Sequence, residues 1–241
     1  MGNVRWLCVT VIAFCLALGA SWLLLAQVDF AYDWLYSFMD IPKHIAKYAP
    51  EYAERADFVE TNFAEHSRMF AEVVTAIHNQ GGGLATLSYY SPDGQLLNTA
   101  FNNDEVIHLQ DVAILIDRLL LGLKVMLVVF VVLLAWLSIT RQVLPSFKSL
   151  LAYVIIALLL ITVVVLLVGP YEIFSQLHIW VFPEEHKWKF YYEESVMSNL
   201  MKAPDLFAYI AVLLVVLAVP IFAVMMWLVK QFLGLRSQNN V

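Results

Sequence analysis

The sequence predicts an all-α membrane protein with four transmembrane helices, and its composition, its apolar runs and its charge distribution each support this fold class. Hydrophobic residues make up 61% of the 241 residues and charged residues 14%, whereas soluble domains are about half apolar and a quarter charged. Four apolar runs reach the roughly 20 residues that a helix needs to cross about 30 Å of hydrocarbon. They lie near Trp6–Val28, Leu119–Ile139, Ser149–Val168 and Leu206–Val229.

The charged residues are sorted to opposite sides of these runs. One side carries five flanking basic residues and no acid, namely Arg5, Arg141, Lys148, Lys230 and Arg236. All 20 Asp and Glu residues lie on the other side, 14 in residues 29–118 and six in residues 169–205. Because basic residues near helix ends stay in the cytoplasm, both termini are predicted inside and the acidic segments outside. The formal net charge of −6 belongs to the outer face and argues against nucleic acid as a partner.

These assignments divide the chain into eight segments. Transmembrane helices are expected at 1–28, 119–139, 149–168 and 206–229, extracytoplasmic segments at 29–118 and 169–205, and cytoplasmic segments at 140–148 and 230–241. We expect the first extracytoplasmic segment to form a small α+β subdomain and the second to be a short loop. Each cytoplasmic piece is too short to fold, because a domain needs about fifty residues or more.

The first apolar run is interpreted as a retained anchor rather than a cleaved signal peptide. Its apolar core exceeds the usual h-region of about 7–15 residues, and no A-x-A site follows it. A lipid-modified cysteine is the alternative, but Phe14 stands before Cys15 where a small residue is required. The other cysteine, Cys8, lies in the same run, so no cysteine is available to cross-link the outer segments.

The first outer segment shows three local patterns. Tyr32, Trp34, Tyr36 and Phe38 follow the first run closely, and such aromatic residues commonly sit at the headgroup level. Asp57 with Glu60 predicts the N-terminus of an amphipathic helix that ends at the glycines 81–83. The turn sequence Ser-Pro-Asp-Gly at 91–94, between two short apolar stretches, predicts a β-hairpin.

The candidate chemistry lies where the outer segments approach the membrane. Glu105, His108 and Asp111 are spaced three apart, so on a helix they share a face. A carboxylate one turn from an imidazole can fix its tautomer, as general-base catalysis requires. The alternative is a solvated helix start whose acids are favoured by the helix dipole. In the second outer segment His178 and Trp188 are distinctive, with interfacial packing as their alternative role.

Several familiar catalytic patterns are absent from the sequence. It contains no G-x-S-x-G elbow, no H-E-x-x-H pair and no Walker loop. The six histidines show no spacing typical of zinc ligands. His178, His186 and Glu184 could meet at a metal only through folding. We therefore predict no metal and no cofactor.

A set of short motifs resembles the bacterial lipoprotein intramolecular transacylase (Lit) family. They are Glu-x-x-His-Leu-x-Asp-Val within 101–112 and, after two membrane helices, Phe-x-x-x-His, Phe-Pro, Trp-x-Phe and a proline before the last helix. The family's usual Asn-Asp beside Phe-Pro is here Glu184-Glu185. The resemblance implies a bacterial inner-membrane enzyme that moves the sn-2 acyl chain of a diacylglyceryl-modified cysteine onto its own α-amino group, giving lyso-form lipoprotein.

The resemblance also implies partners and roles for the site residues. The partners are a diacylglyceryl-modified lipoprotein and membrane lipid, and a membrane-protein partner is left open. His108, oriented by Asp111 or Glu105, would take the proton of the α-amino group, whose pKa is about 8. His178 would act as a second acid-base group or polarise the ester carbonyl. Trp188 and Tyr171 would shape the site.

Two other functions compete with the enzyme. One is a non-enzymatic extracytoplasmic sensor or partner-binding membrane protein, because the hairpin resembles strands of Cache-type sensors. The other is a small transporter or channel subunit, but the membrane runs hold few polar groups to form a path. We favour the enzyme. If His108 and His178 share one site, this would support the enzyme. If they are separate and face solvent, this would support the partner-binding protein.

Overall fold

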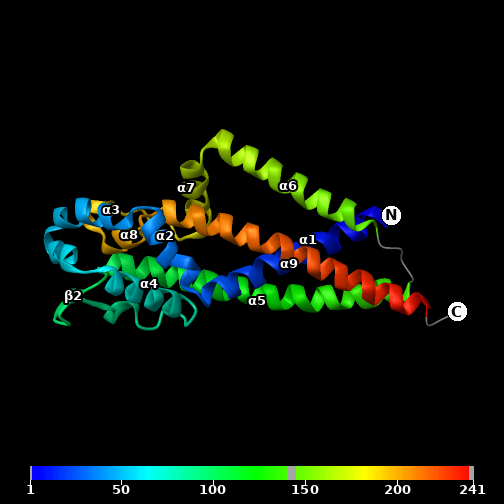
Figure 1. Cartoon of the computed structure of the whole chain (residues 1–241), viewed down its shortest axis with the longest axis horizontal. Helices are drawn as coiled ribbons and strands as arrows, with labels where there is room; N and C mark the ends of the chain where they lie inside the picture. Colours follow the sequence, from blue (N-terminus) through cyan, green and yellow to red (C-terminus); the bar gives the residue numbers. More distant parts are fainter. Residues whose placement is uncertain (1, 141–144, 239–241) are drawn as a thin grey trace. The chain divides into compact units, whose positions relative to one another are not determined.

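Four long apolar helices dominate the chain. The computed structural model describes residues 2–140 and 145–238, and within them four helices are long and apolar enough to cross a membrane. They are α1 (Gly2–Ala26), α5 (Asn103–Ile139), α6 (Phe147–Val168) and α9 (Asp205–Gln238), as Figure 1 shows. The predicted, mostly helical fold with four candidate membrane-spanning helices is confirmed, and the orientation of these helices stays a prediction. Arg141 and parts of the segments 140–148 and 230–241 lie outside the described residues.

The chain forms two compact units. The first contains the described residues of 1–24, 119–169 and 212–241, and the second contains residues 25–118 and 170–211. The first unit is therefore built mainly from the four long helices, and the second from the shorter elements together with the first turns of α5 and α9. Each unit combines pieces that are far apart in the sequence.

Small and aromatic residues pack the four helices of the first unit together. Ala13 and Ala17 of α1 are fully buried, and the Phe14 ring meets the Phe222 ring edge to face, with centres 5.9 Å apart. A Cβ added to Gly19 would lie 2.4 Å from the Leu123 side chain, so this glycine permits a close approach of α1 and α5. Side chains without such partners are apolar and exposed, as expected of a surface that faces lipid.

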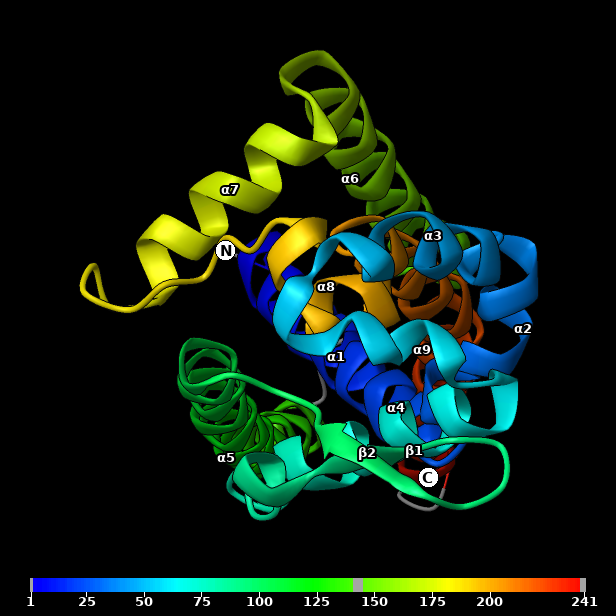
Figure 2. The same cartoon turned by 90° about the vertical axis from the view of Figure 1, so that its left-hand side faces the viewer.

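Short helices and one hairpin make up the second unit. The α-helices are α2 (Tyr32–Phe38), α3 (Ile41–Tyr48), α4 (Phe63–Ile77), α7 (Pro170–Val181) and α8 (Val196–Met201). Single 3₁₀ turns occur at Asp29–Ala31, Ala49–Glu51, Leu84–Thr86 and Tyr192–Glu194, with a longer 3₁₀ helix at Ala53–Glu60. Figure 2 shows α3 beside α8 and β1 beside α4. The expected short loop at 169–205 thus contains two helices.

The predicted hairpin is confirmed, with strands β1 (Ser88–Tyr90) and β2 (Leu96–Thr99). The strands are antiparallel, and Tyr89 pairs with Asn98. Gly94 has a φ of 83°, which the turn requires and which glycine adopts without strain. Arg68 of α4 donates a hydrogen bond to the Ser88 carbonyl at 2.7 Å, which fixes the hairpin to that helix.

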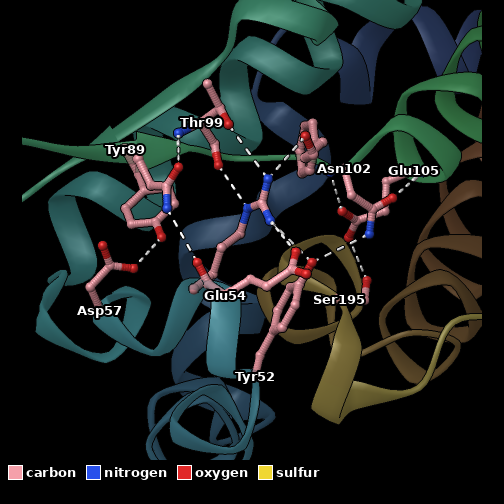
Figure 3. A network of polar contacts seen from close by, with 11 residues as sticks. Tyr52, Glu54, Asp57, Tyr89, Thr99, Asn102, Glu105 and Ser195 are labelled. Atoms are coloured by element: carbon pink, nitrogen blue, oxygen red, sulfur yellow. Dashed lines mark hydrogen bonds and ion pairs between the residues drawn. The ribbon is translucent and has the colours of Figure 1, made fainter.

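The amphipathic helix begins later than predicted. Asn62 caps α4 by accepting a hydrogen bond from the Glu65 amide at 3.0 Å, and the residues before it form the 3₁₀ helix. Asp57 does not serve as the cap, because its carboxylate accepts a hydrogen bond from the Tyr89 hydroxyl (Figure 3). Asp57 therefore binds a residue distant in sequence, Tyr89, instead of the backbone amides of a helix start.

Two of the aromatics expected at the headgroups belong to the core of the second unit. Tyr32 is 1% exposed, stacks on Phe70 at 4.1 Å and donates a hydrogen bond to the Leu200 carbonyl. Tyr36 is also buried, whereas Trp34 and Phe38 lie on the other face of α2 and are more than half exposed. The headgroup interpretation was therefore wrong for Tyr32 and Tyr36. It stays a prediction for the other two.

His66 is a buried histidine that makes the fold sensitive to acid. Its ring lies between the Tyr36 hydroxyl, 2.8 Å from Nδ1, and the Thr61 hydroxyl, 2.5 Å from Nε2. Burial lowers the pKa of His66 from 6.5 to about 4. Below pH 6.5 the His66 imidazole takes up a proton in the unfolded chain, whereas the folded site resists protonation down to about pH 4. The free energy of unfolding therefore decreases as the pH is lowered from 6.5 to about 4.

Lowering the pH from 7 to 5 is expected to cost about 2 kcal/mol of folding free energy through His66. Unfolding of the protein and its His66→Gln variant in detergent, measured at both pH values, tests this. The variant is less stable at pH 7 but loses less stability on going to pH 5. Equal losses would show that His66 does not carry the effect.

Candidate active site

His108 and His178 face each other within the second unit. His108 is on the early part of α5 and His178 on α7, and their ring centres lie 5.9 Å apart with a tilt of 31°. The sequence separates them by seventy residues, yet the fold brings both into one place. This is the shared arrangement that favours chemistry over simple binding.

Aromatic rings surround the two histidines. The rings of Phe182 and Phe190 lie 5.2 and 5.9 Å from the His108 ring. Trp188 packs against His178 at 4.8 Å, and Phe174 packs against it at 4.0 Å. Apolar surroundings strengthen electrostatic interactions inside the site, because little water competes.

The tautomer of His178 follows from its hydrogen bond. Its Nδ1 lies 2.8 Å from the Phe174 carbonyl oxygen, one turn earlier on α7. A carbonyl can only accept, so Nδ1 carries the hydrogen and the neutral ring keeps a free electron pair on Nε2. Burial lowers the pKa of His178, while the bond to Phe174 opposes this change. His178 is therefore a neutral, oriented base at neutral pH.

His108 is more deeply buried, with 8% of its surface exposed. At 1.5 Å per residue α5 is about 55 Å long, which exceeds the roughly 30 Å of a bilayer's hydrocarbon core. His108 lies in residues 103–118, the charged part of α5 that the sequence predicts to be outside the membrane. Burial, and then the nearby His178, lower the pKa of His108 to about 4, while the Asp111 charge opposes the change. Its ring is a neutral imidazole at physiological pH.

Glu105 does not orient His108 as the spacing suggested. One carboxylate oxygen accepts hydrogen bonds from the Ser195 hydroxyl at 2.6 Å and the Met197 amide at 3.0 Å, and the other accepts from the Asn102 amide at 2.8 Å. Asn102 in turn accepts from the Glu105 amide, which completes a capping box at the start of α5 (Figure 3). Glu105 therefore joins the start of α5 to α8.

Asp111 also has a different partner from the one expected. Its carboxylate accepts a hydrogen bond from Nδ1 of His186 at 2.6 Å. The charge still acts on His108, three residues earlier, by opposing the lowering of its pKa. Tyr171 is half exposed, and the Lys189 ammonium lies 5.5 Å from its ring centre. Its role in shaping the site stays a prediction.

A buried arginine supports the start of α5 from the other side. Arg55 donates hydrogen bonds to the Thr99 carbonyl at 2.9 Å and to the Tyr52 hydroxyl at 3.1 Å. The Asn102 side chain reaches the same hydroxyl at 3.5 Å, so the end of β2 and the capping box form one polar network.

Within the described part of the chain, no group of three or more His, Cys, Asp or Glu side chains is arranged to hold a metal ion.

Sequence reasoning missed several residues around the histidines. Phe182 and Phe190 occurred in the motifs but carried no assigned role, and His186 was considered as a metal ligand. The capping box had a readable local signal, because Asn102 is followed three residues later by Glu105. No local sequence signal connects Ser195 with Glu105 or His186 with Asp111, because these partners are 90 and 75 positions apart in the chain.

The fold and the site define an integral membrane protein whose second unit pairs two histidines among aromatic residues. The particular family follows from the sequence match: the model described as lipoprotein intramolecular transacylase Lit matches residues 6–204. The chain belongs to this family, which places it among membrane transferases that act on lipoproteins. No curated protein matches the chain.

Two solved structures share the fold. Both are of the membrane-integral lipoprotein intramolecular transacylase Lit from Bacillus cereus, one of them carrying a histidine-to-arginine substitution. The substituted protein is 14% identical with a TM-score of 0.63, and the match covers 100% of this chain and 95% of the other. The second is 15% identical with a TM-score of 0.62, with 99% and 98% covered.

Proposed function

We propose that this protein moves the sn-2 acyl chain of a diacylglyceryl-modified cysteine to the α-amino group of the same cysteine. The product is an N-acyl, S-monoacylglyceryl lipoprotein, the lyso form. Membership of the family supports the substrate class. The observation that carries the chemistry is the pair of neutral rings, His108 and His178, with centres 5.9 Å apart.

In this proposal His178 is the general base, which exchanges the two roles expected from the sequence. His108 was favoured because two carboxylates share its helix face, but both carboxylates are bonded elsewhere. His178 instead has a fixed orientation and a free Nε2. His108, neutral and buried, donates a hydrogen bond to the ester carbonyl and to the oxyanion that forms there, as an oxyanion-hole donor does.

The reaction balances without an enzyme-bound acyl group. The substrate α-ammonium, with a pKa of about 8, first loses a proton to water. The amine nitrogen attacks the sn-2 ester carbonyl, and His178 takes a second proton from that nitrogen as the C–N bond forms. The C–O bond to glycerol then breaks, and the imidazolium gives its proton to the leaving oxygen. Amine and ester belong to one molecule, so proximity supplies much of the rate.

We further propose that the acidic segments face the outside of a bacterial inner membrane, with both termini in the cytoplasm. The support is the charge distribution, since all 20 acidic residues lie in the two outer segments. This orientation places the histidine pair at the leaflet in which a lipoprotein's glyceryl ester lies. The substrate is held in the membrane by its remaining acyl chain throughout.

Mass spectrometry of a lipoprotein's N-terminal peptide tests the function. The protein is expressed in cells whose lipoproteins carry a diacylglyceryl cysteine with a free α-amino group. Intramolecular transfer leaves the intact mass unchanged. When fragmentation eliminates the S-glyceryl substituent, however, the N-terminal fragment ion of the product retains one acyl mass, whereas that of the substrate retains none. Transfer from a second lipid would raise the intact mass by one acyl group. An unchanged fragment spectrum would refute the proposal.

A further inference from the structure

A segment without regular secondary structure forms one side of the histidine pair. Residues 182–191 follow α7 and contain Phe182, Trp188 and Phe190, whose rings contact His108 or His178. Their contacts depend on where this segment lies relative to α5. Segments with few backbone hydrogen bonds open easily, so the position needs a specific restraint.

His186 provides a hydrogen bond between this segment and α5. It lies midway between Phe182 and Phe190, and its Nδ1 donates to the Asp111 carboxylate at 2.6 Å. Asp111 is one turn from His108 on the same helix, and its side chain is 13% exposed. A partly desolvated bond to a carboxylate is stronger than one in water. Other restraints act further along the segment, among them a Lys187–Glu194 ion pair and a Ser198 bond to the Phe190 carbonyl.

We propose that His186 is a positioning residue, which fastens the 182–191 segment to α5 through Asp111 and so holds the aromatic rings against His108 and His178. It takes no proton from the substrate. Releasing it leaves both histidines in place but lets the rings move, so the rings no longer fix the substrate ester or exclude water. Small losses of orientation lower the rate of chemistry strongly. The inference rests on the proposed acyl transfer for its effect on rate.

The test compares variants of the full chain in lipid nanodiscs, with a synthetic S-diacylglyceryl cysteine peptide as substrate. His186→Ala is expected to lower kcat by about tenfold with a smaller change in KM. His186→Asn, whose side-chain amide nitrogen lies close to the position of Nδ1, is expected to recover kcat to within about threefold. Glu185→Ala removes an exposed side chain of the same segment and is the matched control, with kcat expected within about twofold of the wild type.

A double-mutant cycle tests whether His186 and Asp111 act on kcat as a pair or independently. If His186 acts through Asp111, Asp111→Asn in the His186→Ala background lowers kcat less than it does in the wild type. Independent losses that multiply would overturn the assignment. So would a His186→Ala variant that keeps wild-type kcat.

Hydrogen–deuterium exchange gives a readout that does not depend on activity. Amides of residues 182–191 are expected to exchange about tenfold faster in His186→Ala than in the wild type or His186→Asn. If the wild-type protein forms no N-acyl product, the proposed reaction is wrong, and exchange then decides whether the pair fastens the segment. Unchanged exchange in His186→Ala would overturn the inference in either case.

Discussion

Replacing His178 by alanine is expected to lower the rate of N-acyl product formation by about 10² to 10⁴-fold, the usual contribution of a general base. The variant retains His108 and the aromatic rings, but nothing remains to take the proton from the attacking nitrogen. The rate is measured from the acylated N-terminal fragment by mass spectrometry. Replacing His108 removes a hydrogen-bond donor instead, for which a loss of about 10² to 10³-fold is expected.

His78 provides a matched control for His178. It is a half-buried histidine whose Nδ1 contacts the carbonyl four residues earlier, that of Val74, at 2.7 Å. This is the same local arrangement as His178 with Phe174, but His78 belongs to the end of α4. His78→Ala therefore keeps its activity. A His178→Ala variant that retained more than about a tenth of the wild-type rate would exclude His178 as the base.

Replacing Glu105 by alanine is expected to destabilise the protein by about 3 kcal/mol or more. Three donors lose their acceptor inside the second unit, namely the Ser195 hydroxyl and the amides of Met197 and Asn102. Each buried donor left without a partner costs about 1–3 kcal/mol. The capping box at the start of α5 is lost as well. Denaturant unfolding in detergent measures the effect.

Two variants on the same turn give the comparison. Asp104 is an exposed acid in the first turn of α5, so Asp104→Ala should cost no more than about 1 kcal/mol. Glu105→Gln keeps one acceptor oxygen and should lie between the alanine variant and the wild type. If the three variants were equally stable, the network around Glu105 would not support the site.

The membrane helices could be predicted from the sequence because a bilayer imposes a simple length and composition rule. The hairpin was predictable for a similar reason, since the turn sequence ending in Gly94 requires a positive φ. The second outer segment was not resolved into α7 and α8. Its helices are short. The residues of α8 are buried against partners such as Tyr32, which precedes Leu200 by 168 positions, whereas α7 has no fully buried side chain.

The site was predictable in its members but not in their roles. Spacing and the family resemblance selected His108 and His178, and the structure brings their rings together. The roles of Glu105 and Asp111 depend on Ser195 and His186, which no local pattern connects to them. A helical spacing of three shows which side chains share a face, but not which of them find a stronger partner elsewhere.

The discontinuous second unit has a consequence for biosynthesis. Its two pieces, 25–118 and 170–211, are separated by two membrane helices, and the Glu105–Ser195 bond closes a loop of 90 residues. During synthesis Glu105 therefore has no Ser195 partner until α8 has been made and, in the proposed orientation, has reached the same side of the membrane. We expect the nascent chain to have no acyl-transfer activity before that moment. Under the proposed function, a chain that stalls at an earlier span leaves the glyceryl ester of the lipoprotein intact.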